Sequence, residues 1–209
     1  MLENVEVFHS SIRIAGNKII YFDPFKIAEE RHDADVIFIT HDHYDHFSTE
    51  DIDKVYKENT VLVIPESMSN NKNLSKYKIK LIVNPGIRNT LDELSIIAIP
   101  AYNIGKQFHP KENNWVGYVV TMGETTYYVA GDTDITEEAK NVECDVAFLP
   151  CGGHYTMDYV EAASLANTIM PKIAVPTHYG SIVGDKENGQ RFVELLDKRI
   201  EGVIKIENI

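Results

Sequence analysis

The segment Asp35–Asp51, DVIFITHDHYDHFSTED, constrains this chain more than any other part of its sequence. Its first half, VIFIT, is a short apolar run of the kind that forms buried strands. The run is followed at once by HDHYDH, in which six residues supply three histidines and two aspartates. The chain must therefore fold so that a buried strand delivers five ionisable side chains to the edge of the core.

Three later apolar runs end in a similar way. LSIIAIPAY is followed by Asn103 and then His109, TYYVAG by Asp132 and Asp134, and KIAVPT by His178. Each run has the composition of an inner strand and passes directly into a residue that can bind a metal. Ligand sites at strand ends are common in layered folds, so strands lying side by side would bring these residues together.

The spacing inside HDHYDH favours two metal ions over one. His41 and His43 are two residues apart, and an extended backbone points both side chains the same way. Asp45 and His46 follow after the chain turns, so they point elsewhere. Imidazole and carboxylate ligands suit zinc, iron or manganese, and the cluster contains no cysteine. The alternative is that HDHYDH is a surface loop rich in histidine and aspartate that binds nothing. The metal-capable residues at the ends of the other apolar runs argue against that alternative.

Composition limits the remaining possibilities. The 209 residues are 44% hydrophobic and 25% charged, which fits one globular domain over residues 1–209. A net charge of -12 disfavours nucleic-acid partners and anionic membrane surfaces. No apolar stretch approaches the roughly 20 residues of a membrane span, and no signal-peptide pattern opens the chain. Cys144 and Cys151 match no zinc or redox motif, so cytosolic thiols are expected. We expect a cytoplasmic protein with a small-molecule substrate.

Strand and helix signals alternate along the chain. Residues 4–22 have the pattern of a meander, and Gly123–Glu124 is the predicted turn of a hairpin. Ser48 and Asp158 are predicted to cap helices, and residues 201–209 to form an edge strand. Residues 67–78 are weakly patterned and predict one short helix at most. This order of elements predicts an α/β fold in which helices cover sheets.

Several motifs resemble those of the metallo-β-lactamase fold superfamily. THDHYDH is similar to its HxHxDH signature, and GDTD at 131–134 to its bridging aspartate motif. PTHYGS at 176–181 and YFDPF at 21–25 are similar to its final histidine and early aspartate motifs. The resemblance covers nearly the whole chain. It is closest to small metal-dependent hydrolases related to ascorbate-phosphate lactonases and N-acylphosphatidylethanolamine-hydrolysing phospholipases. It implies a four-layer αββα sandwich with a dinuclear metal centre at one edge.

The resemblance also implies a ligand for each metal. His41 and His43 would hold the first ion, Asp132 would bridge, and the second ion would take Asp45, His46 and His178. Relatives often carry a histidine where Asn103 stands. We expect His109 to reach back from its loop as the replacement, and the alternative is that Asn103 and water complete the first site.

Other residues have two interpretations each. Asp23 either supports a ligating histidine or is a turn aspartate before proline. His9 lies near the metals or in the core. His154 either faces the site as an acid or substrate contact, or packs at a helix entry. Phe108 and Trp115 either line a pocket mouth or belong to the core.

The resemblance implies a hydrolase that uses two divalent ions, zinc first and manganese or iron as alternatives. A metal lowers the pKa of bound water from about 15.7 to about 7, giving hydroxide to attack a lactone, ester, amide or phosphoryl centre. Asp45 is expected to orient the water or carry its proton, with His154 the second choice as acid. The alternatives are a nuclease or phosphodiesterase of the same fold, a di-iron reductase, and a metal-binding protein without turnover. The substrate, the metal and the oligomeric state are not fixed by the sequence.

Overall fold

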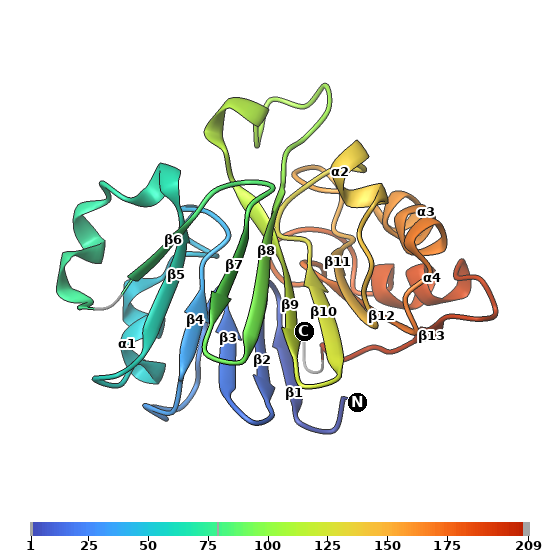
Figure 1. Cartoon of the computed structure of the whole chain (residues 1–209). Coiled ribbons are helices and arrows are strands. Elements are labelled where there is room, and N and C mark those ends of the chain that lie inside the picture. The colour runs from blue at the N-terminus through green and yellow to red at the C-terminus, as the bar shows by residue number, and fades with distance from the viewer. Residues whose placement is uncertain (1, 79, 207–209) are drawn as a thin grey trace.

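Two β-sheets face each other in the computed structural model, which describes residues 2–78 and 80–206 (Figure 1). The first sheet has the strand order β1-β2-β3-β4-β5-β6, and the second has the order β13-β12-β11-β10-β9-β8-β7. The strands of the first sheet are β1 Val5–Phe8, β2 Ser11–Ala15, β3 Ile19–Phe22, β4 Val36–Phe38, β5 Val61–Pro65 and β6 Lys80–Val83. Those of the second are β7 Arg88–Leu91, β8 Leu94–Pro100, β9 Val116–Met122, β10 Thr125–Val129, β11 Val146–Pro150, β12 Ile173–Thr177 and β13 Glu201–Gly202.

Each sheet is antiparallel in one part and parallel in the other. In the first sheet β1, β2 and β3 form an antiparallel meander, and β3 to β6 run parallel. In the second sheet β7 to β10 are antiparallel and β10 to β13 are parallel. Parallel strands are covered on both faces, which explains why β4, β11 and β12 are buried along their whole length.

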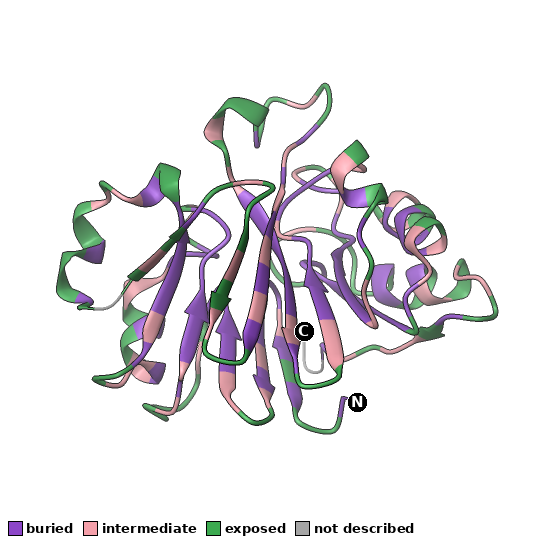
Figure 2. Ribbon diagram, in the orientation of Figure 1, coloured by how far each residue is buried: buried purple, intermediate pink, exposed green. Residues whose placement is uncertain are grey.

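Helices cover the outer faces of the two sheets (Figure 1). Helix α1, Thr49–Val55, packs Ile52 and Val55 into a buried cluster with Ile37 and Ile39 of the first sheet. Helix α3, Tyr159–Ile169, contacts β11, and helix α4, Asn188–Glu194, contacts β12. The main apolar core lies between the sheets, where the strands are mostly buried (Figure 2). The predicted four-layer αββα arrangement is therefore confirmed.

Local signals predicted most elements correctly. Ser48 accepts a hydrogen bond from the Asp51 amide at the start of α1, and Asp158 forms a full capping box with Glu161 at the start of α3. The predicted hairpin across Gly123–Glu124 joins β9 and β10. None of the helices in the described part of the chain is long and apolar enough to cross a membrane.

Four details differ from the sequence prediction. The weakly patterned segment 67–78 forms two 3₁₀ turns, at Glu66–Met68 and Lys72–Lys76, instead of one helix. A short unpredicted helix, α2, spans Glu137–Lys140 and is capped by Thr136. The predicted meander over 4–22 is present, but a turn at His9 divides its first segment into β1 and β2. The predicted edge strand pairs only at Glu201–Gly202, and residues 207–209 lie outside the described chain.

Candidate metal centre

Four loops meet at one edge of the sandwich. They follow β4, β8, β10 and β12, and the loop over residues 101–115 projects from that edge (Figure 1). This is the arrangement predicted from the apolar runs, because each run ends in a residue that faces the same place. The side chains that meet there are His41, His43, Asp45, His46, His109, Asp132 and His178.

One group of these side chains contains three histidines and one carboxylate. His41, His43, His109 and Asp132 each offer a ligand atom, and these atoms lie within 4.8 Å of one another. His41 Nε2 is 3.1 Å from His43 Nδ1, and His109 Nε2 is 3.2 Å from Asp132 Oδ2. The structure thus brings His109 to this group, at the place that the sequence left open between His109 and Asn103.

A second group lies on the other side of Asp132. His46 Nε2 and His178 Nε2 are 3.2 Å and 3.4 Å from Asp132 Oδ1. Asp45 Oδ2 is 3.4 Å from His178 Nε2 and 3.8 Å from His46 Nε2. Asp132 therefore presents one carboxylate oxygen to each group, which is the arrangement that a bridging ligand needs.

Asn103 lies beside the first group and holds the loop that carries His109. Its backbone N–H donates to the His109 carbonyl at 2.8 Å, and its side-chain amide donates to the Tyr155 carbonyl at 2.7 Å. These two bonds tie the ends of the short loop between residues 103 and 109 to each other and to the turn before α3. The loop conformation that results directs the His109 ring toward Asp132.

Several ligand atoms in the cluster are buried without a hydrogen bond. Within the described chain, the atoms without a partner include His46 Nε2, His109 Nε2, Asp132 Oδ1 and His178 Nε2. Buried polar atoms are normally paired, so such a convergence of unpaired atoms indicates that something else binds there. Imidazole and carboxylate donors without sulfur suit zinc, manganese or iron. The residues therefore fit divalent metal ions.

The protonation states are consistent with this fit. Burial lowers the pKa of His41 and of His43, so both rings are neutral and able to coordinate. Burial also opposes protonation of His46, but the carboxylates of Asp132 and Asp23 outweigh it and raise the pKa of His46 well above its usual value. The carboxylates of the cluster thus stabilise positive charge beside them. A bound cation would supply this charge in place of the proton on His46.

Asp23 supports His46 from behind. Its Oδ2 accepts a hydrogen bond from His46 Nδ1 at 2.7 Å and from the Thr40 hydroxyl at 2.7 Å. Its Oδ1 accepts from the Thr40 amide at 2.8 Å. These bonds leave His46 Nε2 free to face the cluster. Of the two interpretations of Asp23, the structure supports the one in which it orients a histidine.

His9 contacts the cluster, so the structure supports the interpretation that places it near the metal ligands. It occupies the turn between β1 and β2 with a φ of 52°, and only 1% of its surface is exposed. Its ring lies 4.1 Å from that of His178, and its Nε2 is 3.3 Å from Asp45 Oδ2. The only sequence signal was the polar break in the strand pattern at FHSS.

Two predicted residues lie outside the cluster. His154 is exposed, and its ring packs near Phe108 and Tyr155 at the rim. Asp134, the second aspartate of GDTD, points away from the ligands. It forms an ion pair with Lys106 and accepts a hydrogen bond from the Ile104 amide at 2.8 Å.

A pocket of about 280 Å³ opens onto the cluster. It is lined by His43, Tyr44, Asp45, Phe108, His109, Asp132, Tyr155, His178 and Ile182. Trp115 lies behind it, with its ring centre 4.9 Å from that of His41 and 4.8 Å from that of His43. Phe108 is thus a pocket residue, whereas Trp115 packs against the histidine rings.

Comparisons with known proteins agree with this geometry. Residues 7–178 match the family model described as the beta-lactamase superfamily domain. A metal-dependent hydrolase of Pyrococcus furiosus is 29% identical over 94% of this chain and 92% of its own length. One from Aeropyrum pernix is 31% identical, covering 89% and 87%. The crystal structure of a candidate metal-dependent hydrolase from Parabacteroides distasonis superposes with a TM-score of 0.78 at 30% identity, covering 97% and 93%.

Proposed function

The chain belongs to the beta-lactamase superfamily, and from that premise we propose that it is a hydrolase with two divalent metal ions in this cluster. The observation that carries the proposal is Asp132, whose two oxygens face separate groups of imidazole nitrogens, each group including at least one nitrogen that is buried without a hydrogen-bond partner. The names of its relatives, which are called metal-dependent hydrolases, support the same class of activity.

The proposed ligands follow the two groups. His41, His43 and His109 would hold the first ion, and Asp45, His46 and His178 would hold the second. Asp132 would be shared between them. We propose zinc as the resident metal, with manganese and iron as alternatives, because imidazole nitrogens outnumber carboxylates in the set.

Bound divalent ions supply water of lowered pKa and polarise the oxygen of a carbonyl or phosphoryl group. The chain's own residues determine how this chemistry is directed. Asp45 lines the pocket and is hydrogen-bonded by His9, which fixes the carboxylate where it can orient a water molecule. His154 at the rim stays a prediction as a proton donor to the leaving group.

The test compares two ligand variants with a matched control. Asp132→Ala and His43→Ala should each abolish metal-dependent hydrolysis and lower the bound metal, while circular dichroism shows an intact fold. Asp42→Ala is the control, because Asp42 belongs to the same motif but is exposed. Elemental analysis and a panel of ester, lactone, amide, phosphodiester and RNA substrates provide the readouts. Wild-type turnover in both ligand variants would refute the proposal.

A further inference from the structure

We infer that the pocket selects an uncharged substrate whose carbonyl carries a small apolar alkyl or aryl group. The recognition surface consists of Tyr44, Phe108, Tyr155 and Ile182, which we call the apolar wall. The inference rests on the proposed hydrolase function and adds its substrate class.

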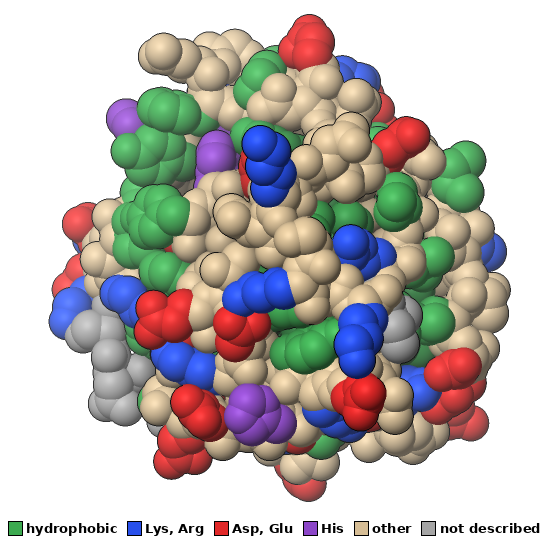
Figure 3. Space-filling view, turned by 90° about the vertical axis from the view of Figure 1, so that its left-hand side faces the viewer, with side chains coloured by type: hydrophobic (Ala, Val, Ile, Leu, Met, Phe, Trp, Pro, Cys, Tyr) green, Lys and Arg blue, Asp and Glu red, His purple; other side chains and the backbone are tan. Residues whose placement is uncertain are grey.

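The pocket lining divides into two parts. The histidines and carboxylates of the cluster form one part, and the apolar wall forms the other. Tyr44, Phe108 and Ile182 are large hydrophobic residues with 67%, 37% and 39% of their surfaces exposed. Figure 3 views the side that carries β6 and α1 and shows hydrophobic side chains gathered next to histidines near the upper edge. Exposed apolar surface concentrated beside a reactive centre is typical of a binding site.

Wall residues and cluster residues come from the same loops. Tyr44 lies between His43 and Asp45, Phe108 precedes His109, and Ile182 follows His178 by four residues. A loop that positions a cluster residue therefore positions part of the wall as well. A substrate carbonyl at the cluster would place its substituent against the wall.

Aromatic contacts hold parts of the wall in place. The Phe108 ring meets the Tyr155 ring edge to face, with centres 4.7 Å apart and an angle of 80°. Tyr44 meets Phe25 in the same way, at 6.1 Å and 78°. Such pairs prefer this geometry, so these contacts favour the observed positions of the Phe108, Tyr155 and Tyr44 rings. The volume of about 280 Å³ is at the lower end of ligand pockets, which limits the apolar group to a small one.

The side chains around the pocket offer no partner to a second, anionic group on the substrate. No lysine or arginine belongs to the described lining, and the charges of Asp45 and Asp132 would be taken up by the ions that they hold. Lys106 comes from the same loop as Phe108, but it pairs with Asp134 and donates to the Thr156 carbonyl at 2.8 Å. A carboxylate at the end of the substrate remote from the ions would find no side-chain counterion and would approach a chain of net charge -12.

The first experiment compares two esters on the zinc-loaded chain. p-Nitrophenyl pentanoate and the p-nitrophenyl monoester of glutaric acid differ only in that a carboxylate replaces the terminal methyl group. We expect kcat/KM to be about tenfold higher for the pentanoate, and to rise roughly threefold per methylene from acetate to butyrate. Equal values for the matched pair, or faster cleavage of bis-p-nitrophenyl phosphate than of every neutral ester, would overturn the inference.

The second experiment assigns the preference to the wall. Phe108→Ala and Ile182→Ala should each lower kcat/KM for the pentanoate about tenfold and leave that for the acetate within about twofold. Metal content should stay at the wild-type value, which separates substrate contact from damage to the cluster. An equal loss for both esters would count against a role in specificity.

A binding measurement adds a readout that does not depend on turnover. Trp115 is the only tryptophan in the chain and packs against pocket histidines, so its fluorescence should report binding. In metal-free and metal-loaded protein, 2-hexanone should bind more tightly than 5-oxohexanoate, in which a carboxylate replaces the terminal methyl group. Tighter binding of the keto acid in both forms would contradict the inference. Hydrolysis without apolar preference would overturn this inference alone, whereas no hydrolysis of any substrate by loaded protein would overturn the proposed function as well.

Discussion

Asp23 is the single side chain that most clearly links the fold to the candidate metal centre. Its carboxylate is fully buried and accepts hydrogen bonds from Thr40 and His46. Because Thr40 lies two residues after the end of β4, these bonds fix the point at which the histidine motif leaves the sheet. Asp23 thereby sets both the path of the loop and the orientation of the His46 ring.

Asp23→Asn should therefore weaken metal binding without unfolding the chain. An amide keeps the shape but offers one acceptor oxygen in place of two, so His46 loses its fixed orientation. Loss of such a partner typically lowers metal affinity by about 10- to 100-fold. Competition with a chelator would measure the effect. Asp92→Asn is the control, because Asp92 is an exposed turn residue paired with Lys18, and equal affinity in both variants would contradict the role of Asp23.

At this scale the sequence predicted the cluster but not all of its surroundings. The predicted ligands come together because each follows an apolar run, and strand ends meet at a sheet edge. His9 could not be assigned, because its contacts are with Asp45 and His178, which lie far away along the chain. The choice between Asn103 and His109 depended on a loop conformation that no local pattern determines.

Among the elements, the loop over residues 101–115 is anchored by Lys106. Its ammonium group pairs with Asp134, donates to the Thr156 carbonyl at 2.8 Å and lies 3.9 Å from a Glu161 oxygen. Asp134 also accepts a hydrogen bond from the Ile104 amide. The loop is thus bound to the segment after β10 and to the start of α3. Since His109 and Phe108 belong to this loop, Lys106 positions both of them.

Lys106→Met should loosen this loop. The variant keeps the length of the side chain but removes the partner of the largely buried Asp134 carboxylate, at a cost of roughly 1–3 kcal/mol in unfolding free energy. We also expect faster hydrogen exchange over residues 103–109 and weaker metal binding. The double variant Lys106→Met/Asp134→Asn should recover part of the lost stability, because it leaves no unpaired charge.

Lys111→Met is the matched control for that variant. Lys111 belongs to the same loop, but it pairs with Glu138 on the exposed surface. Equal effects of the two lysine substitutions on exchange over residues 103–109 would argue against a specific anchor. The sequence had grouped Asp134 with the possible ligands, because residue type and strand-end position do not reveal which way a side chain points.

For the whole molecule, metal binding and folding should be coupled. The cluster is assembled only in the folded chain, so ions that bind it stabilise the fold by mass action. A metal ion present at 100 times its Kd raises the free energy of unfolding by about 2.7 kcal/mol. For a chain of this size, that corresponds to a Tm increase of roughly 5–11 °C.

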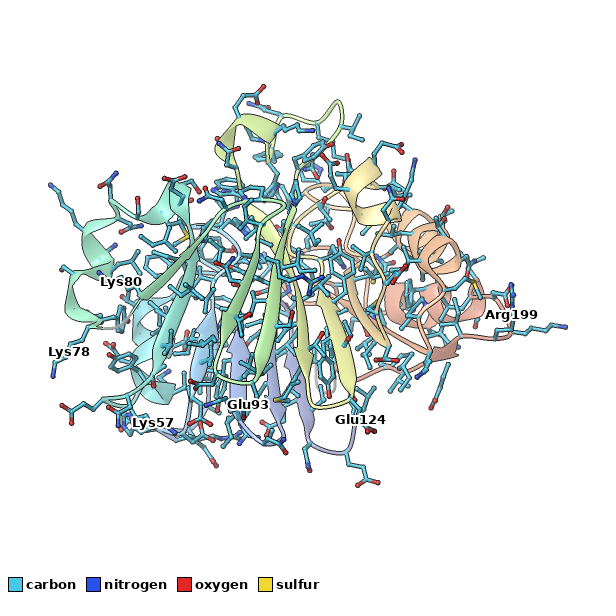
Figure 4. All side chains as sticks on the ribbon, viewed as in Figure 1. Lys57, Lys78, Lys80, Glu93, Glu124 and Arg199 are labelled. Atoms are coloured by element: carbon cyan, nitrogen blue, oxygen red, sulfur yellow. The ribbon has the colours of Figure 1, made fainter. Side chains whose placement is uncertain are left out.

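Thermal unfolding with and without zinc, against a chelator baseline, tests this coupling. Asp132→Ala should lose the zinc-dependent increase in Tm, because the shared carboxylate is missing. The surface carries carboxylates as well, and Figure 4 shows Glu124 directed outward, away from the loop edge. An undiminished shift in Asp132→Ala would mean that zinc stabilises the protein through other sites.

The layered architecture was the most predictable feature at this scale, since strand composition and helix caps are local signals.

The metal ligands are divided between the two sheets. A chain cut at the Pro85–Gly86 turn separates β1–β6, with His41 to His46, from β7–β13, with His109, Asp132 and His178. Neither fragment contains a complete set of donors. The complete set of metal ligands would exist only when the two fragments have reassociated in the correct register. Metal binding would therefore report correct reassembly of the two fragments.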